Sequence, residues 1–439
     1  MTDYEERGKN MRASNAQPAS TRLFTAVFVA IIGVTLCCFL TGQGLNAGTS
    51  VYISRLGGSA TLAGVGAAIF SAAAIVGRLV AGPLADMRGR LLVITVGAIV
   101  LIIGVLGAAL VTNIDYLMIW RFLQGFGFST VTTAAATAAA DVLPAERLGE
   151  GIGYYGLGQA LAMSIGPALA IALVSTDPPE NLFWGLSVFA VLALVLSLFC
   201  RYEKHPERLP ETATYRRIAL RRAALKADEQ ADGDIGEAKP REGFLSKIVE
   251  PGALSGGIPM MILSPAFGFG IFFVGLLGTK LGVENAGIFY TVSALSMIVV
   301  RISSKAFMDR VLPIKLFAVA VVSGIVCFSL LLVVSLPLVS GVLQSGLFYG
   351  AGVFYGLCLG MAVPVNQTVA VKNSRADRWG AANGLFMLLF DVGIGLASVV
   401  WGITNDAMGF PFTIVCTLVL ICASFIAALV AYPASAKSK

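Results

Sequence analysis

The stretch RLVAGPLADMRGR, residues 78–90, places charge where the chain otherwise avoids it. It lies between two long apolar runs, and its small residues continue a face of Ala and Gly at helical spacing that begins at Ala74. Such faces let helices approach closely inside a bilayer. The stretch therefore predicts two closely packed membrane helices joined by a tight charged loop. Asp86 is placed to pair with Arg88 or Arg90, or to lie at the positive N-terminus of the next helix.

The composition of the whole chain explains why this loop stands out. Hydrophobic residues make up 57% of the 439 residues, charged residues only 13%, and the mean hydropathy is +0.83. Apolar runs longer than about 18 residues are typical of membrane-spanning helices. Twelve such runs lie at about 24–46, 60–85, 91–112, 115–140, 150–175, 181–200, 252–278, 285–307, 314–337, 342–369, 380–404 and 410–432. We therefore expect an all-α integral membrane protein with twelve transmembrane helices.

The placement of Lys and Arg predicts the orientation, because basic residues gather on the cytoplasmic side. With a cytoplasmic N-terminus, only Arg55 and Lys280 fall in outer loops and Arg121 falls inside a span, while the other 28 of the 31 basic residues lie at or near the inner side. The polar residues 1–23 precede a run long enough to span, so we expect no cleavable signal peptide. The sequence predicts a protein of the cytoplasmic (inner) membrane of a prokaryote with both termini cytoplasmic.

The chain divides at a polar segment. Residues 201–250 hold 11 basic and 10 acidic residues and no apolar run, which predicts a cytoplasmic linker. Within it, residues 216–226 have the pattern of a basic amphipathic helix that lies on the membrane surface. A solvated helix or a disordered linker fits the same residues equally well.

The two parts on either side of this linker repeat each other. A shift of 223 residues places Arg78 on Arg301 and Asp86 on Asp309, and a shift of 231 places residues 145–153 on 376–384. Repeats of this kind are typical of transporters with a site between two pseudo-symmetric bundles. The predicted organisation is an N-terminal tail (1–23), an N-terminal six-helix bundle (24–200), the linker (201–250), a C-terminal six-helix bundle (251–432) and a C-terminal tail (433–439).

The opening stretch resembles the signature loop of the major facilitator superfamily, in which a Gly is followed by three residues, an Asp, a basic residue, any residue, a Gly and an Arg. The matching residues are Gly82, Asp86, Gly89 and Arg90. Met87 and Leu91 replace the basic residues that the family usually has. The resemblance covers roughly residues 24–432 and implies the major facilitator fold.

In that family the loop forms a charge network that holds the cytoplasmic side shut. The resemblance implies a cytoplasmic gate in which Arg90 reaches toward Asp141, with Arg301 and Asp309 as the remnant of the loop in the second half. A capped tight turn without a gating role is the alternative.

Two further stretches resemble motifs of the same superfamily. RFLQGFG (121–127) is similar to the fourth-helix motif, whose Arg is implicated in proton coupling or substrate binding; a structural Arg bonded to carbonyls of a neighbouring helix is the alternative. GQALAMSIGPALA (158–170) resembles the fifth-helix motif of proton-coupled antiporters and matches it at Gly158, Gly166 and Pro167. The resemblance therefore favours the twelve-helix drug:proton antiporter branch, although an ordinary Pro kink gives the same pattern.

The repeat separates two charges from the others. Arg121 and Asp391 have Gly352 and Ala160 at the corresponding positions, so each is a lone ionisable group near the middle of a span. A charged carboxylate there is costly, so Asp391 either takes up a proton or pairs with a cation. We predict proton coupling or substrate binding at Arg121 and Asp391. A structural Asp paired across the bundle is the alternative.

Other polar residues are candidates for the cavity wall: Gln43, Gln124, Gln159 and Asn366. The seven Cys show no metal spacing, and the single His, His205, lies in the linker, so we expect no metal and no cofactor. The expected partners are a small-molecule substrate, protons and membrane lipid, with no nucleic acid, and the chain is expected to act as a monomer.

These observations predict a secondary active transporter that works by alternating access and couples the export of a small organic molecule to protons. A proton symporter or uniporter that imports a sugar or an organic acid remains the alternative. A membrane sensor or enzyme would need an output domain or a catalytic cluster, which the sequence does not show, so we predict that the protein is not an enzyme.

Overall fold

The computed structural model describes residues 23–110, 113–144, 147–204, 206–210, 213, 215–220, 250–307, 311–374 and 379–432, and the regular elements in these ranges are helices. The helices before the linker, which we call the N-half, are α2 (Ala26–Arg55), α3 (Ala60–Arg88), α4 (Arg90–Leu110), α5 (Ile114–Val142), α6 (Leu148–Val174) and α7 (Asn181–Ser197). Those after it, the C-half, are α10 (Leu254–Phe272), α11 (Val274–Lys280), α12 (Gly287–Phe307), α13 (Pro313–Ser335), α14 (Gly341–Lys372) and α15 (Trp379–Ala431). Short 3-10 turns lie at η2 (Arg201–Lys204), η3 (Pro206–Arg208) and η4 (Pro251–Ala253).

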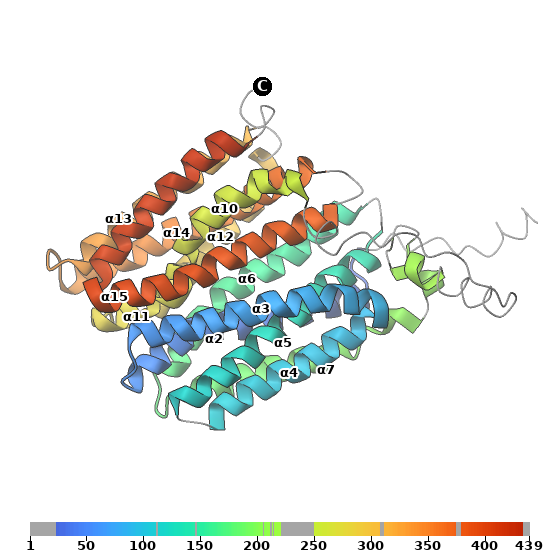
Figure 1. The fold of residues 1–439 in the computed structure, drawn as a ribbon, viewed down its shortest axis with the longest axis horizontal. Coiled ribbons are helices and arrows are strands. Elements are labelled where there is room, and N and C mark those ends of the chain that lie inside the picture. The colour runs from blue at the N-terminus through green and yellow to red at the C-terminus, as the bar shows by residue number, and fades with distance from the viewer. Residues whose placement is uncertain are drawn as a thin grey trace, which may run out of the picture.

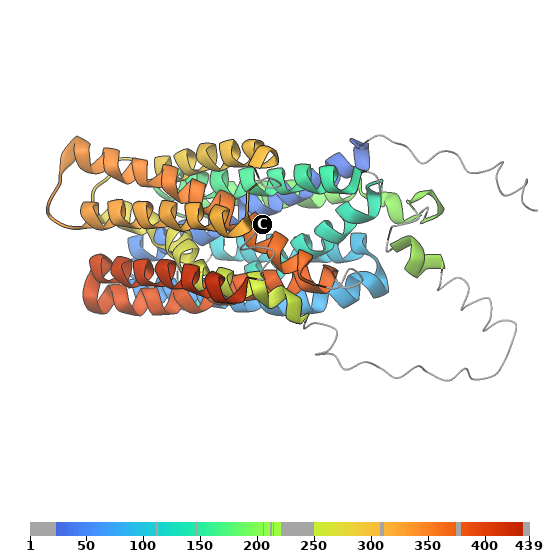
Figure 2. The same ribbon diagram turned by 90° about the horizontal axis from the view of Figure 1, so that it is seen from above.

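The long helices run side by side as one elongated bundle (Figures 1 and 2). We call the end that carries the loop between α3 and α4 and the described residues of the linker, 201–204, 206–210, 213 and 215–220, the linker end. The opposite end, with the loop between α2 and α3, is the far end. Because the chain crosses the bundle with each span, consecutive spans alternate in direction between these two ends; α10 and α11 together form one span, and α15 contains two.

Polar side chains begin three of the helices, and Asn113 is the one before α5, where its Oδ1 accepts the Asp115 N–H at 2.8 Å. Thr25 accepts a hydrogen bond from the Phe28 backbone N–H at the start of α2, and Ser59 accepts one from Leu62 N–H at the start of α3. The first N–H groups of a helix have no partner within it, so a preceding hydroxyl or amide oxygen satisfies one of them. The sequence thus fixes where these spans begin.

Nine helices in the described ranges are long and apolar enough to cross a membrane, fewer than the twelve spans expected. The polar residues of α5, Arg121 and Gln124 among them, lower its hydropathy, and the stretch of α12 whose side chains are described without a gap, Gly287–Arg301, is shorter than a span. The last two expected spans form the single element α15, which is kinked at Gly409, where φ is 80°. The observed all-α membrane fold therefore agrees with the expectation, but the count differs.

Two expected spans differ in their bounds. The first was expected to end near residue 46, but α2 continues to Arg55 because its last turns pack on α7. There the Tyr52 hydroxyl donates to Glu180 at 3.2 Å and its ring meets Phe183 edge to face. The seventh span is interrupted between α10 and α11, at Phe273.

The two halves meet mainly along α3 with α15 and α6 with α12, and α2 also contacts α10 and α11. Figure 1 shows α3 lying beside α15 along its length. Each half also packs internally, as α2 does on α6 and α10 on α15. The seam between α3 and α15 therefore joins parts of the chain that are more than 300 residues apart.

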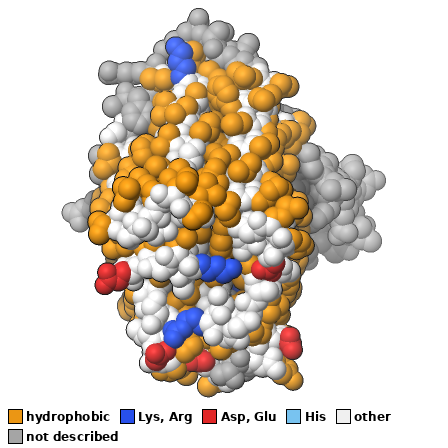
Figure 3. All heavy atoms as spheres, turned by 90° about the vertical axis from the view of Figure 1, so that its left-hand side faces the viewer, with side chains coloured by type: hydrophobic (Ala, Val, Ile, Leu, Met, Phe, Trp, Pro, Cys, Tyr) orange, Lys and Arg blue, Asp and Glu red, His pale blue; other side chains and the backbone are white. Residues whose placement is uncertain are grey.

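The surface of the bundle suits a lipid environment. Large apolar side chains are exposed on many helices, for example Leu110, Val188, Leu396 and Val430. Figure 3 looks onto the far end, where most of the charged side chains lie in the lower part of the view among backbone and other atoms. Buried apolar residues of both halves form one continuous cluster inside the bundle.

Candidate functional site

The tight loop between α3 and α4 depends on Gly89. Its φ of 102° lies in the left-handed region that favours glycine. A Cβ atom at this position would also lie 2.5 Å from the carboxylate of Glu203, which packs against the loop. Glycine is therefore needed both for the turn and for the close approach of the linker.

Arg90 is the centre of a charge cluster at the linker end. Its side chain is fully buried, and it forms ion pairs with Asp86 at 2.9 Å and with Asp141 at 3.0 Å. It also donates to the Ala85 carbonyl at 3.2 Å. The contact expected between Arg90 and Asp141 is thus present and ties α4 to the ends of α3 and α5. Gly82, the first residue of the motif, has open space around it.

The first part of the linker completes this cluster, which the sequence did not predict. One carboxylate oxygen of Glu203 accepts the backbone N–H groups of Arg90 and Leu91, the first residues of α4. The Tyr215 N–H donates to Asp141 at 3.1 Å, and the Tyr215 ring lies 5.1 Å from the Arg90 guanidinium carbon. Neither residue stands out in a charged segment without periodicity. An amphipathic helix was expected over residues 216–226. Residues 216–220 of this range are described, and they are helical.

Arg121 lies at the centre of the N-half and is 1% exposed. Its guanidinium donates to Asn46 Oδ1 at 2.8 Å, to Gln124 Oε1 at 3.1 Å and to the Gly66 carbonyl at 3.2 Å, and it stacks over the Phe70 ring at 4.6 Å. These partners are neutral. Arg121 therefore cross-links α2, α3 and α5, and one of its bonds, to the Gly66 carbonyl, is of the kind that the structural alternative expected; its role in proton coupling or substrate binding stays a prediction.

Asp391 is not the lone carboxylate that the repeat suggested. Its Oδ2 lies 2.7 Å from Nε of Arg78, and the two side chains are 18% and 25% exposed. The comparison of the two half-repeats missed this pair because it matched equivalent positions, whereas the ion pair joins α3 of one half to α15 of the other. A buried charge in a span needs a partner of opposite sign, and here the partner is supplied across the interface.

The Arg78–Asp391 pair closes the linker-end side of a longer seam. Toward the far end, the backbones of α3 and α15 come together where small residues face each other. A Cβ at Gly64 would lie 2.2 Å from the Ser398 carbonyl oxygen, and one at Gly395 would lie 2.9 Å from the Ser71 Cβ. Positions 64, 71 and 78 recur at a spacing of seven, so they lie on one face of α3.

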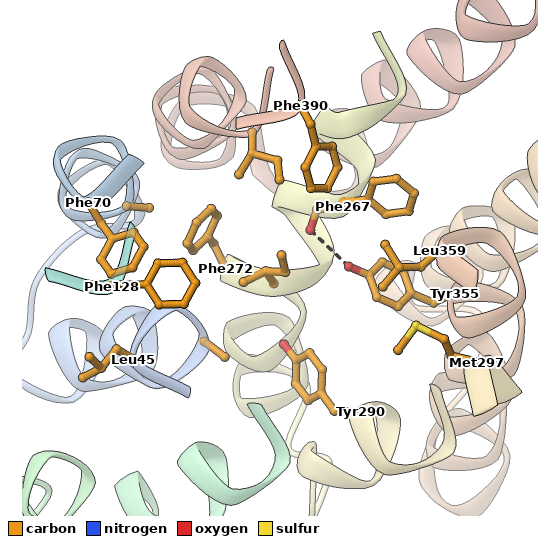
Figure 4. Packing of buried hydrophobic residues seen from close by; sticks show 14 of the residues in the cluster. Leu45, Phe70, Phe128, Phe267, Phe272, Tyr290, Met297, Tyr355, Leu359 and Phe390 are labelled. Carbon is orange, nitrogen blue, oxygen red and sulfur yellow. Dashed lines mark hydrogen bonds between the residues drawn. The ribbon is translucent and has the colours of Figure 1, made fainter. Parts of the chain in front are cut away.

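A small cavity lies between the halves, lined by α2 and α6 of the N-half and by α10, α12 and α14 of the C-half. Gln43, Met163 and Pro167 of the N-half line it, together with five residues of the C-half, Ile271, Tyr290, Ser293, Tyr355 and Leu359. Figure 4 shows Tyr290 and Tyr355 near this centre, with Phe70 and Phe128 of the N-half facing Phe272 of α10. The walls are thus apolar and aromatic with a few polar groups, and the space between them is about large enough for one water molecule.

The four residues expected at the cavity wall have different positions. Gln43 lines the cavity, and Gln159 is half-buried on α6. Gln124 is fully buried, and its amide joins Arg121 to the Gly104 carbonyl. Asn366 is fully buried and bonds to the Ala362 carbonyl and the Tyr432 hydroxyl. The structure thus places Gln124 and Asn366 within helix–helix contacts, away from this cavity, because their amides meet helices of their own half.

The residues of the antiporter-like motif lie on α6 where it faces α2. A Cβ at Gly166 would be 2.9 Å from the Leu40 carbonyl oxygen, and one at Gly158 would be 3.3 Å from Ile32. Pro167 reaches the central cavity. The motif therefore combines a close helix contact with a place on the cavity wall.

The remnant of the loop in the second half is only partly visible. Arg301 is half-buried near the linker end of α12, whereas Asp309 lies outside the described residues. The site as a whole thus consists of the cluster around Arg90, the ion pair between the halves and the central cavity.

A comparison with known protein families identifies the family of this chain. The model of the Major Facilitator Superfamily matches residues 23–398. The chain belongs to the Major Facilitator Superfamily. It is therefore a transporter and not an enzyme, with an all-α, multi-pass membrane fold and a small molecule as its substrate.

Relatives and solved structures agree with this assignment. The chain is 24% identical over 403 residues to the staphylopine export protein of Staphylococcus aureus, covering 90% of this chain and 93% of that one. It is 27% identical over 136 residues to the multidrug resistance protein MdtL of Klebsiella pneumoniae, which is 31% of this chain and 35% of the relative. The nucleoside transporter NupG has the same fold, with a TM-score of 0.64, 16% identity and coverage of 93% and 98%. A POT family transporter structure has a TM-score of 0.69 at 13% identity, with coverage of 92% and 94%.

Proposed function

We propose that this transporter exports a small organic molecule in exchange for protons, and that the ion pair between Arg78 and Asp391 is the coupling element. This ion pair carries the proposal because one of its members is a titratable carboxylate. Oδ2 of Asp391 lies 2.7 Å from Nε of Arg78, so the pair joins the two halves. Alternating access requires the halves to separate at one end at a time. A bond that depends on the charge of Asp391 links that separation to proton binding.

The mechanism follows from the charges. While Asp391 is ionised, Arg78 neutralises it, and α3 and α15 stay together at this level. A proton on Asp391 removes the attraction, and the unpaired Arg78 guanidinium is then more stable when it is hydrated. The halves therefore part more easily on the linker side of the pair. Both side chains are partly exposed, which allows water to deliver the proton. Arg121 acts as a fixed cross-link of the N-half, since each of its three side-chain nitrogens already donates a hydrogen bond within that half.

The cluster around Arg90 serves as the gate element of the N-half in this proposal. It links the ends of α3, α4 and α5, so these helices move as one body when the halves rock. Arg301 and Asp309 would supply the weaker counterpart in the second half. Gly158, Gly166 and Pro167 give α6 its close contact with α2 and its bend beside the cavity.

In this proposal the substrate binds between the halves at the central cavity, which widens as the halves part. The Gln43 side chain is 8% exposed, and its Oε1 has no hydrogen-bond partner among the described residues. A buried acceptor without a partner favours a ligand that donates a hydrogen bond. The aromatic and apolar residues around it, such as Tyr290 and Leu359, suit an organic molecule.

We also propose that the protein works as a monomer in the inner membrane of a prokaryote, with the linker end and both termini in the cytoplasm. The distribution of Lys and Arg supports this orientation, since Arg55 and Lys280 are the basic residues that fall in the loops expected outside. Lipid covers the exposed apolar side chains. Export then runs from the linker end to the far end.

Reconstituted protein tests the coupling. Liposomes that contain the protein and a trapped pH-sensitive dye are given an acidic interior, and ethidium is added first, followed by a panel of other organic cations, acids and neutral compounds. We expect at least one compound to be taken up as protons leave the lumen, and Asp391→Asn to abolish that proton movement. Asp115→Asn, an exposed acid in the first turn of α5, is the matched control. Uptake by Asp391→Asn with an unchanged dependence on pH would contradict the coupling role.

A further inference from the structure

A second carboxylate joins the two halves, at the far end of the same seam. Asp406 of α15 accepts the Ala60 N–H with Oδ1 at 3.0 Å and the Thr61 N–H with Oδ2 at 2.6 Å. These two N–H groups open α3 and have no partner within that helix. A negative charge is favourable at this position because the helix N-terminus is its positive end. Both oxygens of one side chain are thus used by the opposite half.

The α3 helix has its own cap, so Asp406 adds a contact between the halves. Ser59 already accepts the Leu62 N–H at 3.1 Å, as a helix cap does. The bonds from Asp406 reach across 345 and 346 positions in the chain. They therefore hold the position of α15 relative to α3 in addition to completing the first turn.

The backbones touch directly beneath these bonds. A Cβ at Gly402, one turn before Asp406, would lie 2.7 Å from the Ala60 carbonyl oxygen and 3.0 Å from the Thr61 Cα. No side chain can separate the helices here, so the two hydrogen bonds can form only while the far end is shut. If the far end opens, both bonds break together.

The exposure of Asp406 makes this contact reversible. Its side chain is exposed, and Thr61 is half-buried beside it. Water can therefore replace Asp406 at the two N–H groups and hydrate the freed carboxylate, whereas a buried carboxylate would have no such replacement. The contact of Asp406 with the Ala60 and Thr61 N–H groups therefore has a defined geometry but can be broken and remade in water.

We propose that Asp406 is the far-end latch of the transport cycle, a carboxylate of the C-half that holds the outlet shut by binding the first N–H groups of α3. This inference rests on the alternating access of the proposed function. It does not depend on the coupling role of Asp391. The latch sets the fraction of molecules in which the far end is open.

Distances between spin labels test the latch without a substrate or a proton gradient. The labels are attached to cysteines at 110 and 338 for the far end and at 87 and 373 for the linker end, four exposed positions divided between the halves. Cys416 and Cys422 are replaced by Ser, and the other five native cysteines are buried. Pulsed electron spin resonance then gives the population of each distance in liposomes.

We expect Asp406→Ala to increase the far-end-open population at least threefold and to shorten the mean distance at the linker end. Asp406→Asn should have a smaller effect, because its amide oxygen still accepts one N–H. Asp115→Ala removes an exposed acid from the first turn of α5 at the same end, without a bond to the C-half that would be lost, and should leave both distances unchanged. An Asp406→Ala protein with the distances of the wild type would overturn the latch, as would an equal shift in Asp115→Ala.

Gly402→Ala provides a second variant that keeps the charge. Its added methyl group pushes against the Ala60 carbonyl, so the hydrogen bonds to Asp406 are stretched and the far end should open as it does in Asp406→Ala. If Gly402→Ala opens the far end and Asp406→Ala does not, packing alone holds the outlet shut and the latch is wrong. The loss of proton coupling in Asp391→Asn is a separate measurement, so either proposal can fail without the other.

Discussion

The two ends of the seam between α3 and α15 are held by different forces. At the far end, backbones touch at Gly64 and Gly402, and the Asp406 carboxylate binds uncharged N–H groups. At the linker end of the seam, one ion pair, Arg78 with Asp391, joins the halves through side chains alone. A short-range backbone contact and a charge-dependent contact therefore lie on the same pair of helices.

This difference predicts which end should respond more strongly to protonation of its carboxylate. Protonation of Asp391 leaves a full positive charge on Arg78 without its partner, inside the membrane-spanning part of the bundle. Protonation of Asp406 leaves two N–H groups that water can reach. Removing a charge therefore costs more at the linker-end pair than at the far-end latch. Substitutions at the Arg78–Asp391 pair should therefore affect proton coupling, and substitutions at Asp406 should affect the opening of the far end.

The largest expected effect is on the ion pair. Asp391→Asn should reduce proton-coupled transport at least about tenfold, because Arg78 loses a partner that neutralises it across the interface. The exchange variant, Arg78→Asp with Asp391→Arg, restores the attraction in reverse and should recover part of the transport. Transport is measured as dye-reported proton movement in liposomes. If the Asp391→Asn single variant kept full proton coupling, the linker-end pair would not be the charge-dependent contact that distinguishes the two ends.

The next effect concerns the cluster of the N-half. Arg90→Ala leaves Asp141 buried without its cation and should destabilise the protein by about 3–5 kcal/mol. The helices still insert, since their apolar surfaces are unchanged, so we expect impaired transport in a folded protein. Thermal unfolding in detergent measures the loss of stability, and transport is assayed as above. Arg90→Lys, which keeps one charge, should fall between the wild type and Arg90→Ala; unchanged transport in Arg90→Ala would argue against a gate.

The helices and the contact between Arg90 and Asp141 could be predicted from the sequence. The ion pair between the halves could not, for a physical reason. The apolar runs predict helices because lipid requires every backbone group to be bonded within the segment. The contact of Arg90 with Asp141 followed from the resemblance of residues 82–91 to a family motif. Periodicity carries no information about which half a side chain faces. For that reason the pair Arg78–Asp391 was missed.

The partners of the polar residues were also beyond the sequence. Asn366 meets Tyr432, a residue that lies 66 positions away at the end of α15. Glu203 lies in a charged linker whose composition suggested only solvent exposure, yet its carboxylate is bonded to the start of α4. Contacts of this kind are set by tertiary packing, which a local pattern does not encode.

A smaller effect is expected from the backbone contact at the far end. Gly64→Ala places a methyl group 2.2 Å from the Ser398 carbonyl oxygen, so one helix has to shift, at a cost of about 1–3 kcal/mol. Gly395→Ala meets the Ser71 side chain at 2.9 Å, a contact that leaves more room to adjust. Spin-label distances at the far end should therefore increase more in Gly64→Ala than in Gly395→Ala. Equal distances in both variants would show that backbone contact is not what closes this end.

The smallest effect tests the linker contact at the opposite end of the molecule. Glu203→Gln keeps an oxygen acceptor for the Arg90 and Leu91 N–H groups but removes a negative charge from the N-terminus of α4, which is worth about 0.3–1 kcal/mol. Gly89→Ala disturbs the same contact more strongly, because it strains the left-handed turn and collides with the Glu203 carboxylate at 2.5 Å. Thermal unfolding should therefore rank the wild type above Glu203→Gln and Glu203→Gln above Gly89→Ala. Neither variant should change the far-end distances, since Glu203 and Gly89 bind only within the N-half; a far-end shift in Glu203→Gln would mean that the two ends of the bundle are coupled through the linker.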